Sequence, residues 1–378
     1  MQGLPGESSA RGLPPRFHLV VPPPGDAITS PPLSPLAWVG RREFHKNRSD
    51  AALSAIEIAG AYALADTVNI VATQAASFTN SMRVEAVQAR IPCNLCDSEA
   101  RAPFCPENGL GLVQCQNCGL VYVSPRPEAH ELYAIYGESY FKNDNSGVVG
   151  YTNYLRDEAN IRKTVVGRLK RIERWRRPPG RALDVGCAAG FFLSEAEACG
   201  WQVSGIDVST YAVDYARQRF GFDLQIGSLL EADYAPESFD LVSMWDVIEH
   251  VPDPKRYIEA AAQLLKPGGV LVLSTPDVRS LPARMTGRRW VGYKLSAEHI
   301  FYFSAATLSC MLDSAGLEIV EHRHIGKFIT MRLFLDRLGM YSPLLARVLT
   351  VFERAFHLSE RALYINPFDI MCITARKR

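Results

Sequence analysis

The chain has 378 residues, of which 47% are hydrophobic and 21% are charged, so it is long enough for two or three domains with a sizeable core. Its 41 basic and 40 acidic residues give a formal net charge of +1, which does not favour nucleic acid or an anionic membrane as a partner of the chain as a whole. It has no apolar run that could span a bilayer and no secretory signal pattern, so we expect a cytoplasmic protein with reduced cysteines.

Residues 1–81 differ from the rest of the chain. Proline clusters such as Pro22-Pro23-Pro24 predict a disordered or polyproline-like extension, and the alanine-rich stretch from Ser49 to Phe78 predicts one helix. A docking helix or a targeting arm is one interpretation. The favoured interpretation is an unpacked extension, or a translated upstream stretch that is not part of the functional protein.

Residues 90–126 form a compact unit with two CxxC pairs. Cys93 and Cys96 precede Cys115 and Cys118 by an eighteen-residue interval, which can present four thiolates to one ion. We expect a four-cysteine zinc ribbon whose structural Zn²⁺ supplies much of its stability. A redox role is the alternative, although the βαβ pattern typical of such motifs is missing. Cys105 has no assignment.

Residues 127–180 are predicted to form a helical linker or cap. Before it, Gly119–Pro127 alternates like an edge strand and ends at prolines. A tyrosine-rich helix is expected from Glu128 to Phe141, and a long amphipathic helix from Tyr151 to Arg177.

From residue 181 to residue 378, strands and helices alternate, which predicts an α/β domain with a parallel sheet covered on both faces. A helical insertion is expected at about 331–362. It could cover a greasy substrate or bind a partner, but core packing or dimerisation is favoured. The strands are placed near 182–185, 202–207, 222–226, 239–244, 268–274, 317–322 and 369–375.

A glycine-bearing turn follows the first of these strands. Gly186 and Gly190 allow a ligand to approach the backbone, and Asp207, at the end of the next strand, can accept hydrogen bonds from both hydroxyls of a ribose. In a dinucleotide site, glycine would stand where this chain has Asp184. A carboxylate there repels phosphate and suits a cationic ligand.

In the acidic-x-Gly-x-x-x-Gly pattern of Asp184, Gly186 and Gly190, the chain resembles the class I S-adenosylmethionine-dependent methyltransferases. Ser238–Val251 looks like the fourth strand of that family with its following loop, and Leu265–Leu273 looks like the fifth strand. The resemblance implies a Rossmann-like seven-stranded sheet whose last strand runs antiparallel beside the fifth and sixth. A cysteine ribbon before such a domain resembles a bacterial group that methylates sugars, glycans or secondary metabolites. The larger C-terminal domain of the fuller sugar C-methyltransferases has no counterpart after Gly326.

Ligands of such sheets bind at the carboxyl ends of the strands, which selects the residues expected to contact S-adenosylmethionine. They are Asp184, Gly186, Cys187, Ala188 and Gly190 at the methionine end, Asp207 and Val208 at the ribose, Gly227, Ser228 and Leu229 at the adenine, and Trp245 and Asp246 after the fourth strand. Trp245 could equally plug the edge of the sheet.

Methyl transfer depends mainly on alignment, and it needs a base only when the acceptor must lose a proton. The candidates for this base are Glu249, His250 and His299. Capping, packing against Tyr302 or support of a loop would be the structural roles of the two histidines. His322 and His324 are interpreted as structural, and the spacing of ligand residues predicts no catalytic metal site.

The acceptor is expected to be a small molecule, a glycan or a lipid, with oxygen as the favoured methylated atom. Arg284, Arg288, Arg289 and Lys294 could recognise an anionic acceptor, but a solvated basic loop is favoured slightly. The alternatives are an RNA or protein methyltransferase whose ribbon binds the macromolecule, and a non-catalytic scaffold. The oligomeric state is not predicted.

Overall fold

The structure, a computed structural model, describes residues 91–105, 111–142, 154–295, 298–356 and 358–378. All of them belong to one compact unit, Thr67–Arg378. The predictions made for residues 1–81 lie outside this described part. Across the described ranges, every helix is too short or too polar to cross a membrane.

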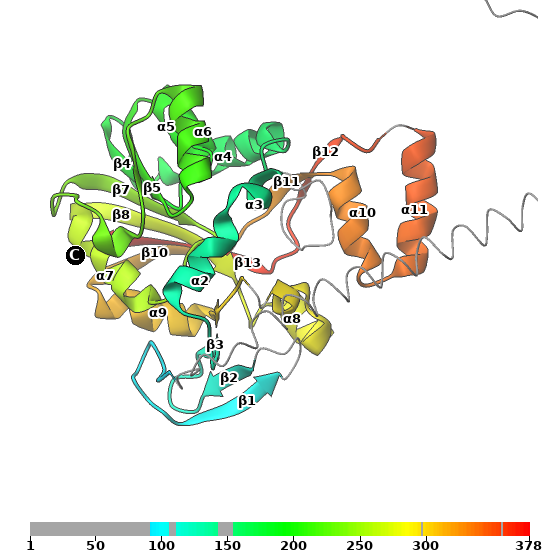
Figure 1. The fold of residues 1–378 in the computed structure, drawn as a ribbon, viewed down its shortest axis with the longest axis horizontal. Helices are drawn as coiled ribbons and strands as arrows, with labels where there is room; N and C mark the ends of the chain where they lie inside the picture. The colour runs from blue at the N-terminus through cyan, green and yellow to red at the C-terminus, as the bar shows by residue number, and fades with distance from the viewer. Residues whose placement is uncertain (1–90, 106–110, 143–153, 296–297, 357) are drawn as a thin grey trace, which may run out of the picture. The chain divides into compact units, whose positions relative to one another are not determined.

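A seven-stranded sheet with the order β10-β13-β8-β7-β4-β5-β6 forms the centre of the unit (Figure 1). β13 runs antiparallel to both β8 and β10, and the other neighbouring strands run parallel. The predicted α/β class and the antiparallel last strand are therefore confirmed. The strands are β4 (Gly180–Val185), β5 (Trp201–Asp207), β6 (Leu224–Ile226), β7 (Phe239–Trp245), β8 (Leu265–Pro276), β10 (Leu317–His324) and β13 (Ile370–Lys377).

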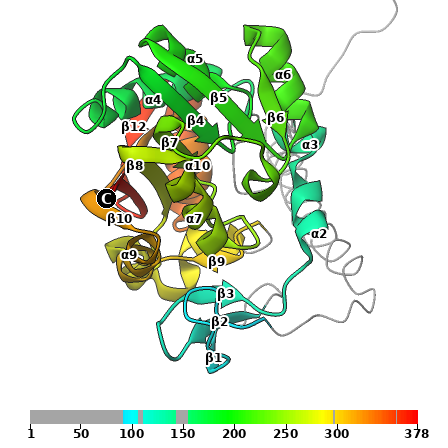
Figure 2. The same cartoon turned by 90° about the vertical axis from the view of Figure 1, so that its left-hand side faces the viewer.

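Helices cover both faces of this sheet, which explains why its central strands are almost continuously apolar (Figures 1 and 2). One face packs against α4 (Glu158–Ile172), α5 (Phe191–Ala198) and α6 (Thr210–Phe220). The other face packs against α7 (Pro254–Leu264) and α9 (Ala305–Ser314). A side-chain cap and a proline fix the start of α7. Asp253 caps α7 through the N–H of Arg256, and Pro254 takes the first helical position.

The cysteine-bearing segment forms a second, antiparallel sheet of four strands in the order β1-β2-β3-β9 (Figure 2). They are β1 (Arg101–Cys105), β2 (Leu112–Cys115), β3 (Val121–Val123) and β9 (Phe301–Tyr302). The prediction that Gly119–Pro127 contains an edge strand is wrong. β3 is buried between β2 and β9, because β9 comes from a distant part of the chain that local patterning does not reveal.

The segment between the two sheets is less regular than predicted. The expected helix Glu128–Phe141 is divided into α2 (Ala129–Tyr133), the 3-10 turn η2 (Ala134–Tyr136) and α3 (Glu138–Lys142). Gly137 adopts an extended conformation, with ψ −176°, and this breaks the helix. Within the predicted helix Tyr151–Arg177, α4 begins at Glu158 and ends at Ile172.

The C-terminal insertion contains two helices framed by a β-hairpin. β11 (Lys327–Thr330) pairs with β12 (Ala362–Ile365), and α10 (Met331–Gly339) and α11 (Pro343–Ala355) lie between them. Short elements complete the rims of the sheet: η3 (Leu229–Glu231), α8 (Leu281–Thr286), η4 (Gly287–Arg289) and η5 (Val291–Leu295).

Candidate functional site

A cavity of about 600 Å³ lies at the carboxyl ends of β4, β5 and β7. This is where ligands bind in open α/β sheets, because the loops that follow parallel strands meet at one edge. The structure brings most of the predicted site residues onto its wall. Those that line it are Asp184, Gly186, Cys187, Ala188, Asp207, Val208, Gly227, Leu229, Trp245, Asp246, Glu249, His250 and His299.

Two predicted ligand contacts lie behind the wall. Gly190 precedes α5 with φ +77°, and a Cβ there would lie 3.0 Å from the Cβ of Ala216, so this glycine permits close helix packing. The Ser228 hydroxyl is 2.8 Å from that of Tyr257 and also accepts a hydrogen bond from the N–H of Leu230.

Asp207 joins the two loops that border the cavity. Its Oδ2 accepts a hydrogen bond from the N–H of Ala188 at 2.8 Å, and its Oδ1 accepts one from the N–H of Ser209 at 2.8 Å. Burial raises the pKa of Asp207, against the opposing effect of these two N–H groups. Each carboxylate oxygen has a second acceptor position, so the group can still receive two ligand hydroxyls.

Asp184 is buried at the end of β4, where its Oδ1 accepts a hydrogen bond from the Ser243 hydroxyl at 2.6 Å. Burial raises the pKa of Asp184 to about 7, with a smaller contribution from the negative charge of Asp207. A cationic ligand in the cavity would favour the ionised carboxylate. Asp184 can therefore change its charge when such a ligand binds.

Arg168 of α4 is a wall residue that the sequence analysis missed. Its guanidinium lies 4.3 Å from the ring centroid of Trp245, and its buried Nε has no hydrogen-bond partner within the described residues. Burial acts to raise the pKa of Asp246, but the positive charges of Arg168 and Lys327 outweigh this effect and hold the pKa below its ordinary value. The helical pattern of α4 showed that residue 168 belongs to a helix, but not that the helix faces this cavity.

Trp245 contributes both to the wall and to the packing behind it. Its ring centroid lies 5.6 Å from that of Phe192, which is the packing role that the sequence left open. Its indole also lines the cavity, and its buried Nε1 lacks a partner in the part of the chain that the structure describes.

Glu249, His250 and His299 form a second group on the wall, with ligand atoms that all lie within 4.8 Å of one another. Such a group can hold a proton or a metal ion, and their spacing along the chain gave no sign of it. Burial raises the pKa of Glu249 well above its ordinary value, and the charge of Asp246 adds to this effect. Burial also lowers the pKa of His250 to about 4 and that of His299 well below its usual range. Both histidines are therefore neutral near pH 7.

The geometry around His250 indicates which ring nitrogen carries its proton. Nδ1 lies 3.0 Å from the carbonyl oxygen of Glu298 and 2.8 Å from the hydroxyl of Tyr136. Because a carbonyl oxygen can only accept, we assign the proton to Nδ1. This assignment leaves the lone pair of Nε2 available, on the side where Oε1 of Glu249 lies 3.9 Å away.

Aromatic side chains from the predicted linker and from the C-terminal insertion extend the cavity away from the sheet. The linker contributes Tyr133, Tyr136, Tyr140, Phe141 and Tyr154, and the later segments contribute Trp290, Phe334 and Tyr341. Arg284, Arg288 and Arg289 are exposed, as a solvated loop requires, and the side chain of Lys294 lies outside the described part. His322 and His324 lie on β10, where Nε2 of His324 is 3.0 Å from Asp277 Oδ2.

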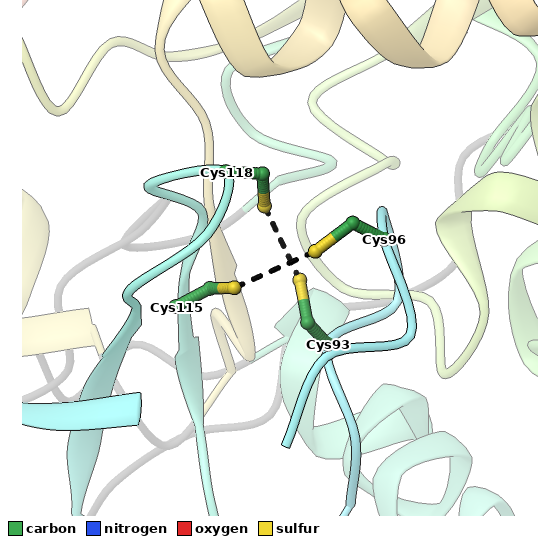
Figure 3. Close-up of side chains that lie close together, drawn as sticks. All are labelled: Cys93, Cys96, Cys115 and Cys118. Atoms are coloured by element: carbon green, nitrogen blue, oxygen red, sulfur yellow. Dashed lines mark hydrogen bonds between the residues drawn. The ribbon is translucent and has the colours of Figure 1, made fainter. Parts of the chain in front are cut away.

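The four cysteines point their sulfur atoms toward one centre (Figure 3). Cys93 Sγ lies 3.4 Å from Cys118 Sγ, and Cys96 Sγ lies 3.6 Å from Cys115 Sγ. A tetrahedral site with Zn–S bonds of about 2.3 Å requires sulfur atoms about 3.8 Å apart, so the arrangement fits this ion with little movement. Burial raises the pKa of the Cys93 thiol to about 11, so a thiolate there needs a neighbouring positive charge.

The cysteine ribbon is hydrogen-bonded to the segment that carries Glu249 and His250. Asn94 Nδ2 donates to Asp253 Oδ1 at 2.8 Å, while Asn94 Oδ1 accepts from the N–H of Lys255 at 3.0 Å. Arg126 Nη2 donates to the carbonyl of Pro252 at 2.7 Å. The ribbon and the loop after β7 therefore stabilise each other's conformation.

Taken together, the fold and the cavity define a Rossmann-like ligand site with two buried carboxylates at its strand ends. Comparison with known proteins gives the family. Residues 158–322 match a family described as a methyltransferase domain. A ubiquinone biosynthesis O-methyltransferase of Xanthomonas axonopodis pv. citri is 34% identical over 168 residues, which cover 41% of this chain and 70% of that protein. The chain belongs to the class I S-adenosylmethionine-dependent methyltransferases.

Two other enzymes of this name are matched over smaller parts of their own length. The enzyme of the same name from Thiobacillus denitrificans is 33% identical over 37% of this chain and 66% of its own length. That of Xanthomonas campestris pv. campestris is 44% identical over 26% of this chain and 44% of its own. A solved S-adenosylmethionine-dependent methyltransferase from Archaeoglobus fulgidus is 20% identical, with a TM-score of 0.41, over 59% of this chain and 99% of that one.

We expect Gly186→Ala to destabilise the turn after β4 more than glycine replacement at a comparable backbone position. A Cβ at residue 186 would lie 2.5 Å from Val247 Cγ2, and φ is +72°. Strain and the clash together should lower the free energy of unfolding by about 2–4 kcal/mol, as measured by urea denaturation. Gly221→Ala is the control, since φ is +76° but no heavy atom lies within 4 Å. Equal losses in the two variants would contradict the clash.

Proposed function

We propose that the protein transfers a methyl group from S-adenosylmethionine to an oxygen atom of a small-molecule acceptor. The observation that carries this proposal is the pair of buried carboxylates, Asp184 and Asp207, at the ends of adjacent parallel strands. A carboxylate in place of the phosphate-binding glycine suits a cationic ligand, and a second carboxylate suits a ribose. The matched relatives, named as O-methyltransferases of ubiquinone biosynthesis, support the choice of oxygen.

The charge and position of the wall residues suggest which part of S-adenosylmethionine each of them binds. Asp207 binds the ribose hydroxyls, and Gly227 and Leu229 border the adenine. Asp184 faces the ammonium and sulfonium charges, and the unpaired N–H of Arg168 is available to the methionine carboxylate. Trp245 presents an aromatic face beside them. This division adds Arg168 to the set expected from the sequence and leaves out Gly190 and Ser228, which do not line the cavity.

The chain's main contribution to methyl transfer is to hold the acceptor in line with the methyl group. When bound, S-adenosylmethionine supplies an electrophilic methyl carbon with a good leaving group, so no metal is needed to activate it. Methyl transfer would then need an acceptor oxygen held in line with that carbon, with the sulfur as the leaving group. The aromatic wall excludes water and positions the acceptor, and this alignment supplies most of the acceleration.

The acceptor hydroxyl must lose a proton, and His250 is the residue best placed to take it. Its Nδ1 is occupied by Glu298 and Tyr136, so Nε2 accepts the proton. The pKa of about 4 keeps His250 neutral, and therefore able to accept, at any pH well above 4. Tyr136 acts through His250 as a positioning residue, since its hydroxyl helps to fix the ring.

The four cysteines bind one structural Zn²⁺ in this proposal. The convergence of four sulfur atoms at short distances supports it, as does the need for a cation that compensates buried thiolates. Because all four positions are protein thiolates, the ion has no open position for substrate. Its role is to order the ribbon and, through Asn94 and Arg126, the loop after β7.

Binding of S-adenosylmethionine tests the proposed function directly. By calorimetry, we expect Asp207→Ala to weaken binding by at least about tenfold, equivalent to 1.4 kcal/mol. Because the bound cation favours ionised Asp184, whose pKa is about 7, affinity should fall as pH is lowered from about 8 to 6.

Two variants show whether Asp184 or Glu298 causes this pH dependence of the affinity. Asp184→Asn should bind weakly with little dependence on pH. Glu298→Gln should keep the dependence, although burial also raises the pKa of Glu298 to about 7. No binding of S-adenosylmethionine by the folded wild-type protein would refute the proposed function.

His250→Asn should lower kcat by about 10²- to 10⁴-fold without changing the affinity for S-adenosylmethionine, because it removes the proton acceptor. Methyl transfer to a panel of phenolic, catecholic and sugar acceptors, followed with a labelled methyl group, provides the measurement. His322→Asn on β10 is the matched control. The wild-type kcat/KM should show no loss of this base between about pH 8 and 6, since the pKa of His250 is about 4. An unimpaired His250→Asn would exclude this residue as the base.

Removal of zinc should unfold the ribbon and loosen the site. We expect elemental analysis to find one zinc ion per chain, and chelation or Cys115→Ser to cost on the order of several kcal/mol of stability in thermal unfolding. Activity should fall at the same time, because Asn94 and Arg126 contact the loop that carries His250. Cys199→Ser, which changes an exposed cysteine, should have neither effect. A metal-free protein with unchanged stability would rule out the structural zinc.

A further inference from the structure

The helix α11 presents an apolar face to solvent. Its outer side chains are exposed by between 48% and 75%, whereas its opposite side, with Ala346 and Glu353, is buried. In Figure 1, α11 is the outermost helix of the C-terminal insertion. The core packing expected for this segment therefore does not account for its outer face. The exposed apolar residues are Leu344, Leu345, Val348, Val351, Phe352 and Phe356.

The helix α8 adds a second exposed apolar patch, with Leu281 exposed by 66% and Met285 by 77%. The segments next to these helices meet near the cavity, because the N–H of Val291 in η5 donates to the hydroxyl of Tyr341, in the turn before α11, at 3.0 Å. Pro282 and Thr286 of α8 line the cavity, as does Tyr341 of the α10–α11 turn. We refer to residues 281–292 and 331–356 as the α8/α11 surface.

The α8/α11 surface carries a strong excess of positive charge. It contains seven arginines and two acidic residues, whereas the whole chain has a formal net charge of only +1. One of the acidic residues, Glu353, is buried and accepts a hydrogen bond from the Ser359 hydroxyl. The near-neutral total of the chain therefore conceals a local excess of positive charge. Six of the arginines are exposed, namely Arg284, Arg288, Arg289, Arg332, Arg347 and Arg354, whereas Arg337 lines the cavity and its Nε is buried.

Apolar side chains flanked by arginines fit the interface of an anionic bilayer. The apolar face can enter the region of the acyl chains, and the guanidinium groups remain with the lipid headgroups. α11 has 13 residues and is about 20 Å long, so it would lie in the plane of the interface and not across it. A second copy of the chain fits less well. It would bring the same arginines together, and Asp336 is the one exposed acidic residue of this surface.

We propose that the α8/α11 surface docks the protein on an anionic lipid bilayer. Residues of α8 and of the α10–α11 turn also form part of the cavity wall, so docking brings that side of the cavity to the lipid. An acceptor dissolved in the membrane could then reach the cavity without crossing water. Docking does not depend on methyl transfer, so each can be tested without the other.

Sedimentation of the full-length protein with lipid vesicles tests this inference. At about 0.1 M salt, we expect binding to phosphatidylcholine vesicles that contain about one third phosphatidylglycerol, and much weaker binding to phosphatidylcholine alone. The double variant Val351→Ser with Phe352→Ser should bind on the order of tenfold more weakly. Val166→Ser, which changes an exposed apolar residue of α4, should bind like the wild type.

A charge reversal with a matched control examines the arginines. Arg288→Glu with Arg289→Glu should weaken binding on the order of tenfold or more. Arg174→Glu with Arg219→Glu makes the same change in net charge at exposed residues elsewhere and should have a much smaller effect.

Light scattering of the same samples tests the alternative that a second copy of the chain covers the α8/α11 surface. A wild-type protein that fails to bind anionic vesicles would overturn the proposal, as would equal losses in both charge-reversal variants. A wild-type dimer that Val351→Ser with Phe352→Ser converts to a monomer, without vesicle binding by either form, would assign the surface to a second copy. Binding of S-adenosylmethionine by the apolar variant would show that its loss of docking is not a loss of fold.

Discussion

The two hydrogen bonds that Asp207 accepts from backbone N–H groups hold the candidate site together. They tie the turn after β4 to the start of α6, so one carboxylate fixes the relative position of two loops. The remaining acceptor positions of the same group face the cavity. Its structural role and its proposed role in ligand binding are therefore combined in one side chain. Preorganisation of this kind reduces the ordering that binding would otherwise require.

The conformation of the segment around His250 also depends on the ribbon. β9 joins the ribbon sheet, while Asn94 and Arg126 bond to the residues that follow His250. The hydroxyl of Tyr136, in the linker, is also hydrogen-bonded to His250. The proposed base is thus held by segments that lie more than 100 residues apart in the chain. The cysteine cluster and the methyltransferase domain form one structural unit even though their sequence signatures are separate.

Local patterns were sufficient for the main sheet, since buried strand segments such as Val270–Leu273 are apolar and follow turn residues. They were also sufficient for the two carboxylates and the four cysteines, because strand ends and CxxC spacing fix those positions. Local patterns did not predict features whose position depends on contacts with distant parts of the chain. β9 has two residues and no periodicity, and the turn of Arg168 toward Trp245 follows from how α4 packs. The grouping of Glu249 and His250 with His299 likewise depends on a contact between distant residues, since the N–H of Ile300 donates to the carbonyl of Glu249.

The pairing of β3 with β9 also limits where the chain can be divided. A fragment that began after the ribbon would leave β9 as an open strand edge with unpaired N–H and C=O groups. It would also expose the aromatic rings of Phe301 and Tyr302, which are almost fully buried in the intact protein. An uncovered edge beside apolar rings is a template for aggregation. The ribbon therefore covers this strand edge and these rings, independently of any part it plays in the reaction.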